Sequence, residues 1–362
     1  MKRRNFLRGA AVVGAATGLA APAIAQERTT WRMVTTWPRN FPGSGGGAQR
    51  LADRITTMSG GRLTVEVFPA GEMVPALGTF DAVIEGSAEM SHGAAYYWQN
   101  KSQATNFFTG VPFGMTAGEL SAWVRHMGGQ ALWDEVYDQF GVQAFLNGNT
   151  AIQAGGWFAN ELTGISDIEG INFRTPGLGG QVWQRIGATV VNLPAGEIFA
   201  ALQSGALDAT EFVGPYNDLA LGFHQIHKHY YISSFIEPGL ATELTVNKAK
   251  FQALPDDLRA IVEIACQAEY DQVAADFAAN DPLALQQIAD AGVTIHTQFP
   301  DEILEAGANA ALEIYNELRE SNDPLTKKVT EHFIASLATV RSRTEGTDLS
   351  YMLARQKYFD PT

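Results

Sequence analysis

The feature that most constrains the fold is a repeated alternation of strand-like and helix-like segments, separated by Pro and Gly residues. The strand-like runs are 31–37, 63–68, 90–95, 171–175, 189–193 and 209–213. The helix-like runs are 48–58, one that begins at 75, 181–186, 196–204 and 255–291. Because a strand–helix–strand order places successive strands side by side and parallel, the pattern predicts an α/β fold with helix-covered parallel sheets.

The chain has 362 residues, 46% of them hydrophobic, which is enough for two domains with separate cores. Two α/β lobes joined by crossing segments describe a hinged clamp of the periplasmic binding-protein type, with a ligand between the lobes at the carboxyl ends of the strands. The expected division is 26–150 plus about 240–280 for lobe I, 151–239 plus about 281–300 for lobe II, and 301–362 for a helical extension.

A long helical pattern over 255–291 would reach ~50 Å, enough to cross both lobes. We expect Asp281-Pro282 to bend or break it, because proline lacks the helix-forming N–H. The tail carries apolar residues at helical spacing that need a surface to cover: Phe333, Ile334, Leu337 and Val340.

Residues 1–25 form an export signal. Arg3-Arg4 is a twin-arginine motif, a mildly apolar stretch follows from about Gly9 to Ala21, and Ala23-Ile24-Ala25 has the small residues of a cleavage site. No later segment has the ~18 continuous apolar residues that a membrane helix needs. The sequence therefore predicts a periplasmic protein that is soluble once the signal is removed.

The formal charge is −14, and removal of the four basic residues of the signal takes it to −18. A chain this acidic repels nucleic acid and anionic lipid, so neither is an expected partner. An anionic ligand would need a local positive group, which makes a buried Arg informative. The single cysteine, Cys266, lies in an apolar helical run, where we expect core packing and no disulfide.

Two motifs suggest other sites. Ser44-Gly45-Gly46-Gly47 lies in an expected loop before a helix and could cradle an anion, but no Gly-Lys-Ser/Thr follows it. His224, His227 and His229 could suggest zinc and a metal-dependent enzyme, although on a helix the third would point away from the other two. We expect a solvated helix end there. No nucleophile elbow or paired catalytic acids stand out.

Seven stretches spread over most of the chain carry a family resemblance. They are GRLTVEVFPAGE at 61–72, FDAV at 80–83, GSAEM at 86–90, NTAIQAGGWF at 149–158, FRTPGLGG at 173–180, EFVGP at 211–215 and EPG at 237–239. In these stretches the chain resembles the DctP family, the extracytoplasmic solute receptors of tripartite ATP-independent periplasmic (TRAP) transporters. The most similar subgroup binds 2-oxo acids of the pyruvate type together with a cation.

Arg174 ends an expected strand just before a Pro-Gly turn, where its guanidinium could hold a carboxylate through two parallel hydrogen bonds. From spacing alone, a surface ion pair is an equal alternative; the resemblance implies the ligand clamp. The resemblance also implies that the Glu211 carboxylate, the Phe212 carbonyl and the Gln153 side-chain oxygen bind a cation. Such hard oxygen donors favour Na⁺ or Ca²⁺. Relatives often have Trp where Phe212 stands, and a backbone ligand tolerates that change.

Further candidates are less constrained. Glu237, in a Glu-Pro-Gly turn, is either another cation ligand or an exposed acid. Asn149 could donate its amide to the ligand carboxylate. Tyr96 and Tyr97 could supply a hydroxyl, and because only one of two neighbours in a strand faces the cleft, we favour Tyr97.

The expected function is thus a receptor that captures a small 2-oxo monocarboxylate with Na⁺, or alternatively Ca²⁺. A 2-hydroxy acid such as lactate, bound with Ca²⁺, offers the same oxygen set and is the main alternative. An export chaperone is another, which would predict a wide aromatic groove without an Arg and cation pair. The resemblance implies a membrane permease of a small and a large subunit as partner, and a homodimer formed by exchange of the C-terminal tail.

Overall fold

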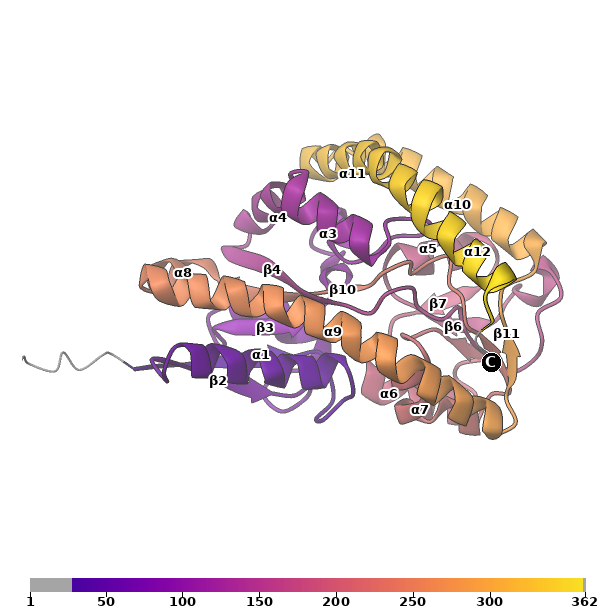
Figure 1. Ribbon diagram of the computed structural model, residues 1–362, viewed down its shortest axis with the longest axis horizontal. Coiled ribbons are helices and arrows are strands. Elements are labelled where there is room, and N and C mark those ends of the chain that lie inside the picture. Colours follow the sequence, from indigo (N-terminus) through magenta and orange to yellow (C-terminus); the bar gives the residue numbers. More distant parts are fainter. Residues whose placement is uncertain (1–27, 361–362) are drawn as a thin grey trace, which may run out of the picture.

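The structure is a computed structural model that describes residues 28–360, so the expected signal at 1–25 lies outside the described residues. Two sheets lie side by side, with helices packed around them, and one long helix runs past both (Figure 1). The α/β, two-lobed prediction is confirmed. Among the described residues no helix is both long enough and apolar enough to cross a membrane.

The first sheet has five strands in the order β2-β1-β3-β10-β4. Their bounds are β1 Thr29–Thr35, β2 Leu63–Phe68, β3 Met90–Gly93, β4 Val142–Asn149 and β10 Ala241–Asn247. β1 runs parallel to β2 and β3, but β10 is antiparallel to β3 and β4. The prediction of a purely parallel sheet is wrong here, because β10 arrives directly from the second sheet and not through a crossover helix.

The second sheet has six strands in the order β11-β9-β5-β8-β6-β7. Their bounds are β5 Gly156–Phe158, β6 Asn172–Arg174, β7 Thr189–Val191, β8 Ala209–Thr210, β9 His229–Tyr231 and β11 Thr294–His296. β6, β7 and β8 are parallel neighbours, whereas β5 is antiparallel to β8 and β9. β8 is shorter than the predicted 209–213, since the chain leaves the sheet at Glu211.

Helices cover both sheets. Their bounds are α1 Ser44–Met58, α2 Thr79–Ile84, α3 Ala117–His126, α4 Gly129–Asp138, α5 Gly177–Arg185, α6 Ala195–Gln203, α7 Pro215–Leu221 and α8 Lys248–Ala253. Local sequence explains where several begin. At α3, for example, Glu119 accepts hydrogen bonds from the backbone N–H and hydroxyl of Thr116, which satisfies donors at the helix start. α7 starts with Pro215, whose missing N–H costs nothing at that position.

The glycine-rich segment is not a loop. Residues Ser44–Gly47 form the first turn of α1, so the expected anion cradle before the helix is wrong. The lack of side chains serves packing: a Cβ on Gly47 would lie 3.2 Å from a Val273 methyl on the neighbouring long helix. Close approach of α1 to that helix explains Gly47, while a Cβ on Gly45 would lie 2.9 Å from Phe41 in the preceding loop.

The long helix α9 spans Asp256–Asp290 without a break. It packs against α1 and β4 beside the first sheet and against α7 beside the second (Figure 1). We expected Asp281-Pro282 to bend or break the helix; Pro282 lies inside it, so the break is wrong. Contacts with both sheets stabilise the helix on either side of the proline and outweigh the one lost hydrogen bond. Together with the segments 150–155 and 232–240, α9 connects the two sheets.

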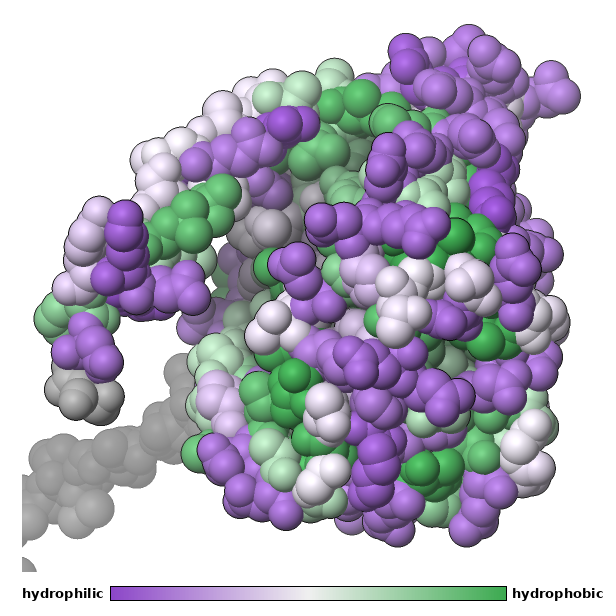
Figure 2. Space-filling model, turned by 90° about the vertical axis from the view of Figure 1, so that its right-hand side faces the viewer, coloured by the Kyte–Doolittle hydropathy of each residue, from purple (hydrophilic) through white to green (hydrophobic). Residues whose placement is uncertain are grey.

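The tail is helical, as predicted, with α10 at Asp301–Arg319, α11 at Pro324–Arg343, a π-helical turn η6 at Thr344–Leu349 and α12 at Ser350–Tyr358. Phe333 of α11 is buried against Phe107 and Trp123, and Ile334, Leu337 and Val340 pack beside it. α12 buries no residue. In the space-filling view it stands off the body as an arm, with a hollow between them (Figure 2).

Candidate functional site

The carboxyl ends of three parallel strands bring the main candidate residues together. Arg174 is the last residue of β6 and pairs with Thr210 of β8 and Val191 of β7. Glu211 follows directly after β8, and its N–H donates to the Arg174 carbonyl at 3.0 Å. Ligands of α/β proteins bind at this end of parallel strands.

The Arg174 side chain is buried and only partly paired. Its Nε donates to the Leu193 carbonyl at 2.9 Å and its Nη1 to the Glu211 carbonyl at 2.7 Å. Nη2 is buried and has no hydrogen-bond partner. The surface ion pair that spacing left open is wrong. The guanidinium can still donate from Nη1 and Nη2 to a carboxylate. Nε is not available for such a contact, because it already donates to the Leu193 carbonyl.

Oxygen atoms converge beside Arg174. The end of the Gln153 amide that faces Glu211 lies 2.8 Å from Glu211 Oε1 and 2.9 Å from the Phe212 carbonyl oxygen. The other end of the amide lies 2.9 Å from Thr150 Oγ1. With nitrogen facing Glu211, the amide donates to both oxygens. With oxygen facing Glu211, the amide oxygen lies beside both of these oxygens, an arrangement that a bound cation or a proton on Glu211 would stabilise. The hard oxygen set fits Na⁺ or Ca²⁺.

Two buried carboxyl groups adjoin this cluster. Burial raises the pKa of Glu211 to about 8, with Asp218 adding to the rise and Arg174 opposing it. Thr175 Oγ1 donates to Glu211 Oε2 at 3.2 Å. Burial also raises the pKa of Glu237, and the neighbouring Glu211 raises it further. Glu237 Oε2 has no hydrogen-bond partner. A buried carboxyl oxygen without a partner is costly, so Glu237 favours an arriving cation beside Glu211.

Asn149 presents an unpaired donor. Its Oδ1 accepts from the Ala151 N–H at 2.8 Å, which leaves Nδ2 buried without a partner. Asn149 ends β4, and Gln153 follows four residues later in the segment that connects the two sheets. The Gln153 N–H donates to the Glu237 carbonyl at 3.0 Å, so the connecting segments are joined at the site.

Tyr96 and Tyr97 lie in a 3₁₀ turn, η2 at Ala95–Trp98, and not in a strand. The alternation that favoured Tyr97 therefore does not apply. The two rings pack edge to face with centroids 4.8 Å apart. Burial raises the pKa of both hydroxyls, and the Arg174 guanidinium opposes that rise in both. Both residues thus lie within electrostatic reach of the site.

The candidate residues form one buried group. Arg174, Glu211, Glu237, Gln153, Asn149 and Phe212 are each at most 4% exposed. The Phe212 ring packs 5.2 Å from the Arg174 guanidinium carbon. Sequence reasoning missed Thr175, although it neighbours Arg174 at the strand end, and it missed Asp218, for which the sequence offered no signal.

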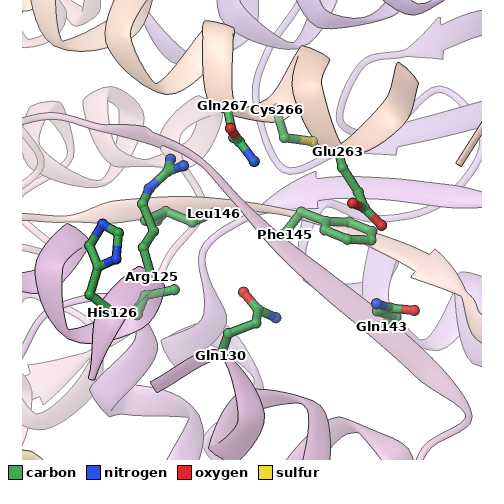
Figure 3. A pocket seen from close by; sticks show the side chains of 10 residues that line it. Arg125, His126, Gln130, Gln143, Phe145, Leu146, Glu263, Cys266 and Gln267 are labelled. Carbon is green, nitrogen blue, oxygen red and sulfur yellow. The ribbon is translucent and has the colours of Figure 1, made fainter. Parts of the chain in front are cut away.

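The open pocket in Figure 3 lies elsewhere. Its volume is about 530 Å³, and it lies between α9, α3, α4 and β4, where Arg125, Gln130 and Cys266 line it. None of the candidate residues contributes to it.

The histidines do not form a cluster. His229 Nδ1 lies 3.1 Å from His296 Nε2 on the neighbouring strand β11, and not beside His224 or His227. Within residues 28–360 no three His, Cys, Asp or Glu side chains are arranged to hold a metal. The alternative zinc site at this motif therefore has no support, because His229 lies on β9 whereas His224 lies on a separate 3₁₀ turn, η5 at Phe223–Gln225.

Comparison with known proteins shows the family of this chain. The family model for bacterial extracellular solute-binding protein family 7, DctP, matches residues 33–322, and a model of the twin-arginine signal matches residues 1–20. The monocarboxylate 2-oxoacid-binding periplasmic protein of Nostoc sp. is 37% identical over 97% of this chain and 98% of its own.

Two solved structures are also similar. A TRAP periplasmic solute-binding protein of Pseudoalteromonas atlantica, with bound sodium and pyruvate, is 35% identical with a TM-score of 0.87, over 92% of this chain and 100% of its own. A TRAP solute-binding protein of Bordetella bronchiseptica, a dimer with calcium and picolinate in one of its sites, is 30% identical with a TM-score of 0.88, over 91% and 98%. The chain therefore belongs to the DctP family of periplasmic TRAP solute receptors.

Proposed function

We propose that this receptor captures a small 2-oxo monocarboxylate of the pyruvate type together with Na⁺, or alternatively Ca²⁺, and delivers it to a TRAP permease. The observation that carries the proposal is that the buried candidate residues include both hydrogen-bond donors and a carboxyl oxygen that have no partner. Arg174 Nη2 and Asn149 Nδ2 are donors without acceptors, and Glu237 Oε2 is an acceptor without a donor. A carboxylate and a cation, bound together, satisfy both.

The chemistry of a 2-oxo acid suits this arrangement. Its carboxylate oxygen and its oxo oxygen are adjacent and can chelate one cation. Arg174 would take the carboxylate end-on, with Asn149 as a second donor. Glu211, Gln153, Glu237 and the Phe212 carbonyl would hold the cation, which keeps the ligand anion and the acidic side chains from repelling each other. Pyruvate, the ligand in the first of the two similar structures, has this pair of oxygens, and picolinate, the ligand in the second, has a ring nitrogen in place of the oxo oxygen.

A 2-hydroxy acid with Ca²⁺ remains the second candidate ligand, since its hydroxyl replaces the oxo oxygen in the same chelate. An enzyme is not proposed, because the arrangement supplies charge neutralisation at both ends of a ligand but no nucleophile beside it. An export chaperone would need an open aromatic groove, whereas the candidate group is buried.

Access to the buried group requires the two lobes to separate. We take lobe I as 26–150 with about 240–280 and lobe II as 151–239 with about 281–300. The three connections between the sheets would act as the hinge, and ligand binding would favour the closed form. The permease, with a small and a large membrane subunit, is then expected to recognise that closed form.

A homodimer through the tail is part of the proposal. Apolar side chains around α12 are exposed by 48–76%: Leu349, Tyr351, Met352, Leu353, Tyr358 and Phe359. A groove of about 600 Å³ separates Leu349 and Met352 from Ala151 and Ile152 of the body (Figure 2). A second copy that fills this groove would bury them. The similar Bordetella bronchiseptica protein is described as a dimer, which supports this assembly.

The proposal is tested by a thermal-shift screen of pyruvate, lactate and larger 2-oxo acids, each with and without Na⁺ or Ca²⁺. A ligand that binds only the folded protein raises the melting temperature by mass action. We expect stabilisation by a 2-oxo acid only when a cation is present. Stabilisation by lactate alone among these acids would favour the second candidate.

A further inference from the structure

A buried carboxylate lies behind the expected cation site and holds the peptide that forms it. Asp218 of α7 is fully buried. Its Oδ2 accepts from Trp157 Nε1 and from the Tyr230 hydroxyl, each at 2.9 Å. Its Oδ1 accepts from the Val213 N–H at 3.4 Å. The Val213 N–H belongs to the same peptide unit as the Phe212 carbonyl.

The planarity of that peptide links Asp218 to the cation site. In a trans peptide the N–H and the C=O point in opposite directions. With the N–H held by Asp218, the Phe212 carbonyl points away from Asp218. Its oxygen lies 2.9 Å from the Gln153 amide, on the side where the oxygens converge. The hydrogen bond to Asp218 therefore fixes the direction in which the Phe212 carbonyl oxygen points.

The surroundings make this anchor rigid. Trp157 and Tyr230 stack with ring centroids 4.1 Å apart, on the adjacent strands β5 and β9. The Val213 carbonyl accepts from the Ala154 N–H at 2.8 Å, beside Gln153. Residue 213 is thus fixed at both its N–H and its C=O, and small rotations of the Phe212–Val213 peptide are opposed on two sides.

We propose that Asp218 is a positioning residue for the cation: by anchoring the Val213 N–H it aims the Phe212 carbonyl oxygen at the ion. The inference rests on the proposed function, since it assumes that a cation binds between Gln153, Glu211 and Phe212. Asp218 does not touch the ion itself. Partners that orient the ligands of a metal in this way typically change its affinity about 10–100-fold when removed.

The chain contains a matched control. Glu243 is also buried, and it also accepts from one tryptophan, Trp98 Nε1 at 2.7 Å, and one tyrosine, the Tyr137 hydroxyl at 2.8 Å. Burial raises the pKa of both carboxyls to about 7. Glu243 lies on β10 and anchors no peptide of the candidate site. Replacement of Glu243 should lower the free energy of unfolding, as replacement of Asp218 does, but should leave the affinity for the cation unchanged.

The experiment compares Asp218→Ala, Asp218→Asn and Glu243→Ala with wild type. Ca²⁺ is titrated calorimetrically in the presence of pyruvate, and stability is measured by urea unfolding. Both alanine variants should lose stability. Of these two, only Asp218→Ala should also weaken Ca²⁺ binding, by about 10–100-fold. Asp218→Asn should also weaken Ca²⁺ binding, because its one side-chain oxygen accepts from the Trp157 N–H and the Tyr230 hydroxyl, which leaves its NH2 group facing the Val213 N–H.

The outcomes separate this inference from the proposed function. If wild type binds pyruvate and Ca²⁺ together but Asp218→Ala binds Ca²⁺ as well as Glu243→Ala does, the positioning role is wrong and the function stands. If Asp218→Asn binds Ca²⁺ as tightly as wild type, the acceptor for the Val213 N–H does not set the affinity, and the inference is also wrong. A wild-type protein without cation-dependent binding would overturn both.

A second measurement needs no variant, in case Asp218→Ala does not fold. A cation on the Phe212 carbonyl polarises the peptide and strengthens its N–H as a donor. In ¹⁵N-valine-labelled wild type, the Val213 amide proton should therefore move downfield when Ca²⁺ and pyruvate are added. An unchanged Val213 resonance under conditions where both bind would overturn the inference.

Discussion

Arg174 and Glu211 lie beside each other without forming a tight ion pair. Nη1 of Arg174 is 3.9 Å from the Glu211 carboxylate Oε2 but donates to the Glu211 backbone carbonyl at 2.7 Å. The Arg174 guanidinium is thus held by backbone carbonyl groups, and it does not form a direct hydrogen bond with the Glu211 carboxyl group. Both side chains therefore keep atoms that can contact a bound ligand and a cation.

Replacing Arg174 by Lys should remove most of the stabilisation that pyruvate and a cation give in a thermal-shift assay. A lysine ammonium cannot present two parallel N–H groups to a carboxylate. The ligand-free protein should also lose roughly 1–3 kcal/mol, because the Leu193 or Glu211 carbonyl loses its donor. Arg32→Lys is the control, since Arg32 forms a comparable two-point contact with Glu89 away from the site. Equal ligand responses in both variants would contradict the role of Arg174.

Replacing Gln153 by Leu should weaken Ca²⁺ binding at least about tenfold, because it removes one oxygen from the converging set. Pyruvate affinity should then depend much less on the cation. Gln130→Leu serves as the control, because Gln130 bonds to Asp134 and the Ala144 carbonyl in the separate open pocket. Calorimetric titration measures both variants. Retained Ca²⁺ affinity in Gln153→Leu would mean that the amide donates to Glu211 and takes no part in cation binding.

Glu243 should make the ligand-free protein less stable as the pH rises. Burial raises its pKa from 4.5 to about 7. Between these values the folded state holds a proton that the unfolded state has lost, so stability is fully present below pH 4.5 and is lost as the pH rises through 7. In urea unfolding, Glu243→Gln should remove roughly 2 kcal/mol of that decline between pH 5 and 7. An exposed control, Glu66→Gln, should leave it unchanged; an unaltered slope in Glu243→Gln would contradict the raised pKa.

Deletion of residues 344–362 should convert the dimer into a monomer. The exposed apolar side chains that a second copy would bury belong to this segment. Light scattering coupled to gel filtration measures the mass directly. The single change Leu353→Glu should weaken the dimer without shortening the chain, since a charge would enter the apolar contact. A full-length protein that is already monomeric at high concentration would refute the assembly.

Much of the fold could be predicted because its signals are local. Alternation at 63–68 predicted β2 with both bounds correct, and the pattern over 255–291 predicted α9 within one residue at each end. The errors arose where distant contacts decide. Pro282 stays within α9 because both sheets support that helix, and Ser44–Gly47 are helical because α1 packs closely on α9.

The site was predictable to a similar extent. Arg174 and Glu211 end adjacent parallel strands, and strand-end position is visible in sequence. The burial of Glu237, by contrast, depends on the connection between the sheets, so a turn acid and a site carboxyl look alike in sequence. Tyr96 and Tyr97 were assigned by a strand rule that fails in a 3₁₀ turn. Asp218 contributes through its hydrogen bond to the Val213 N–H, and the spacing of residues in the sequence does not predict that contact.

The most direct test of the account is a calorimetric titration of pyruvate into protein freed of metal by a chelator, before and after adding back Na⁺ or Ca²⁺. We predict saturable 1:1 binding only with a cation present, and none for acetate, which has a carboxylate but no oxo group. Equally tight pyruvate binding in the metal-free protein, or no binding of any 2-oxo acid with either cation, would contradict it.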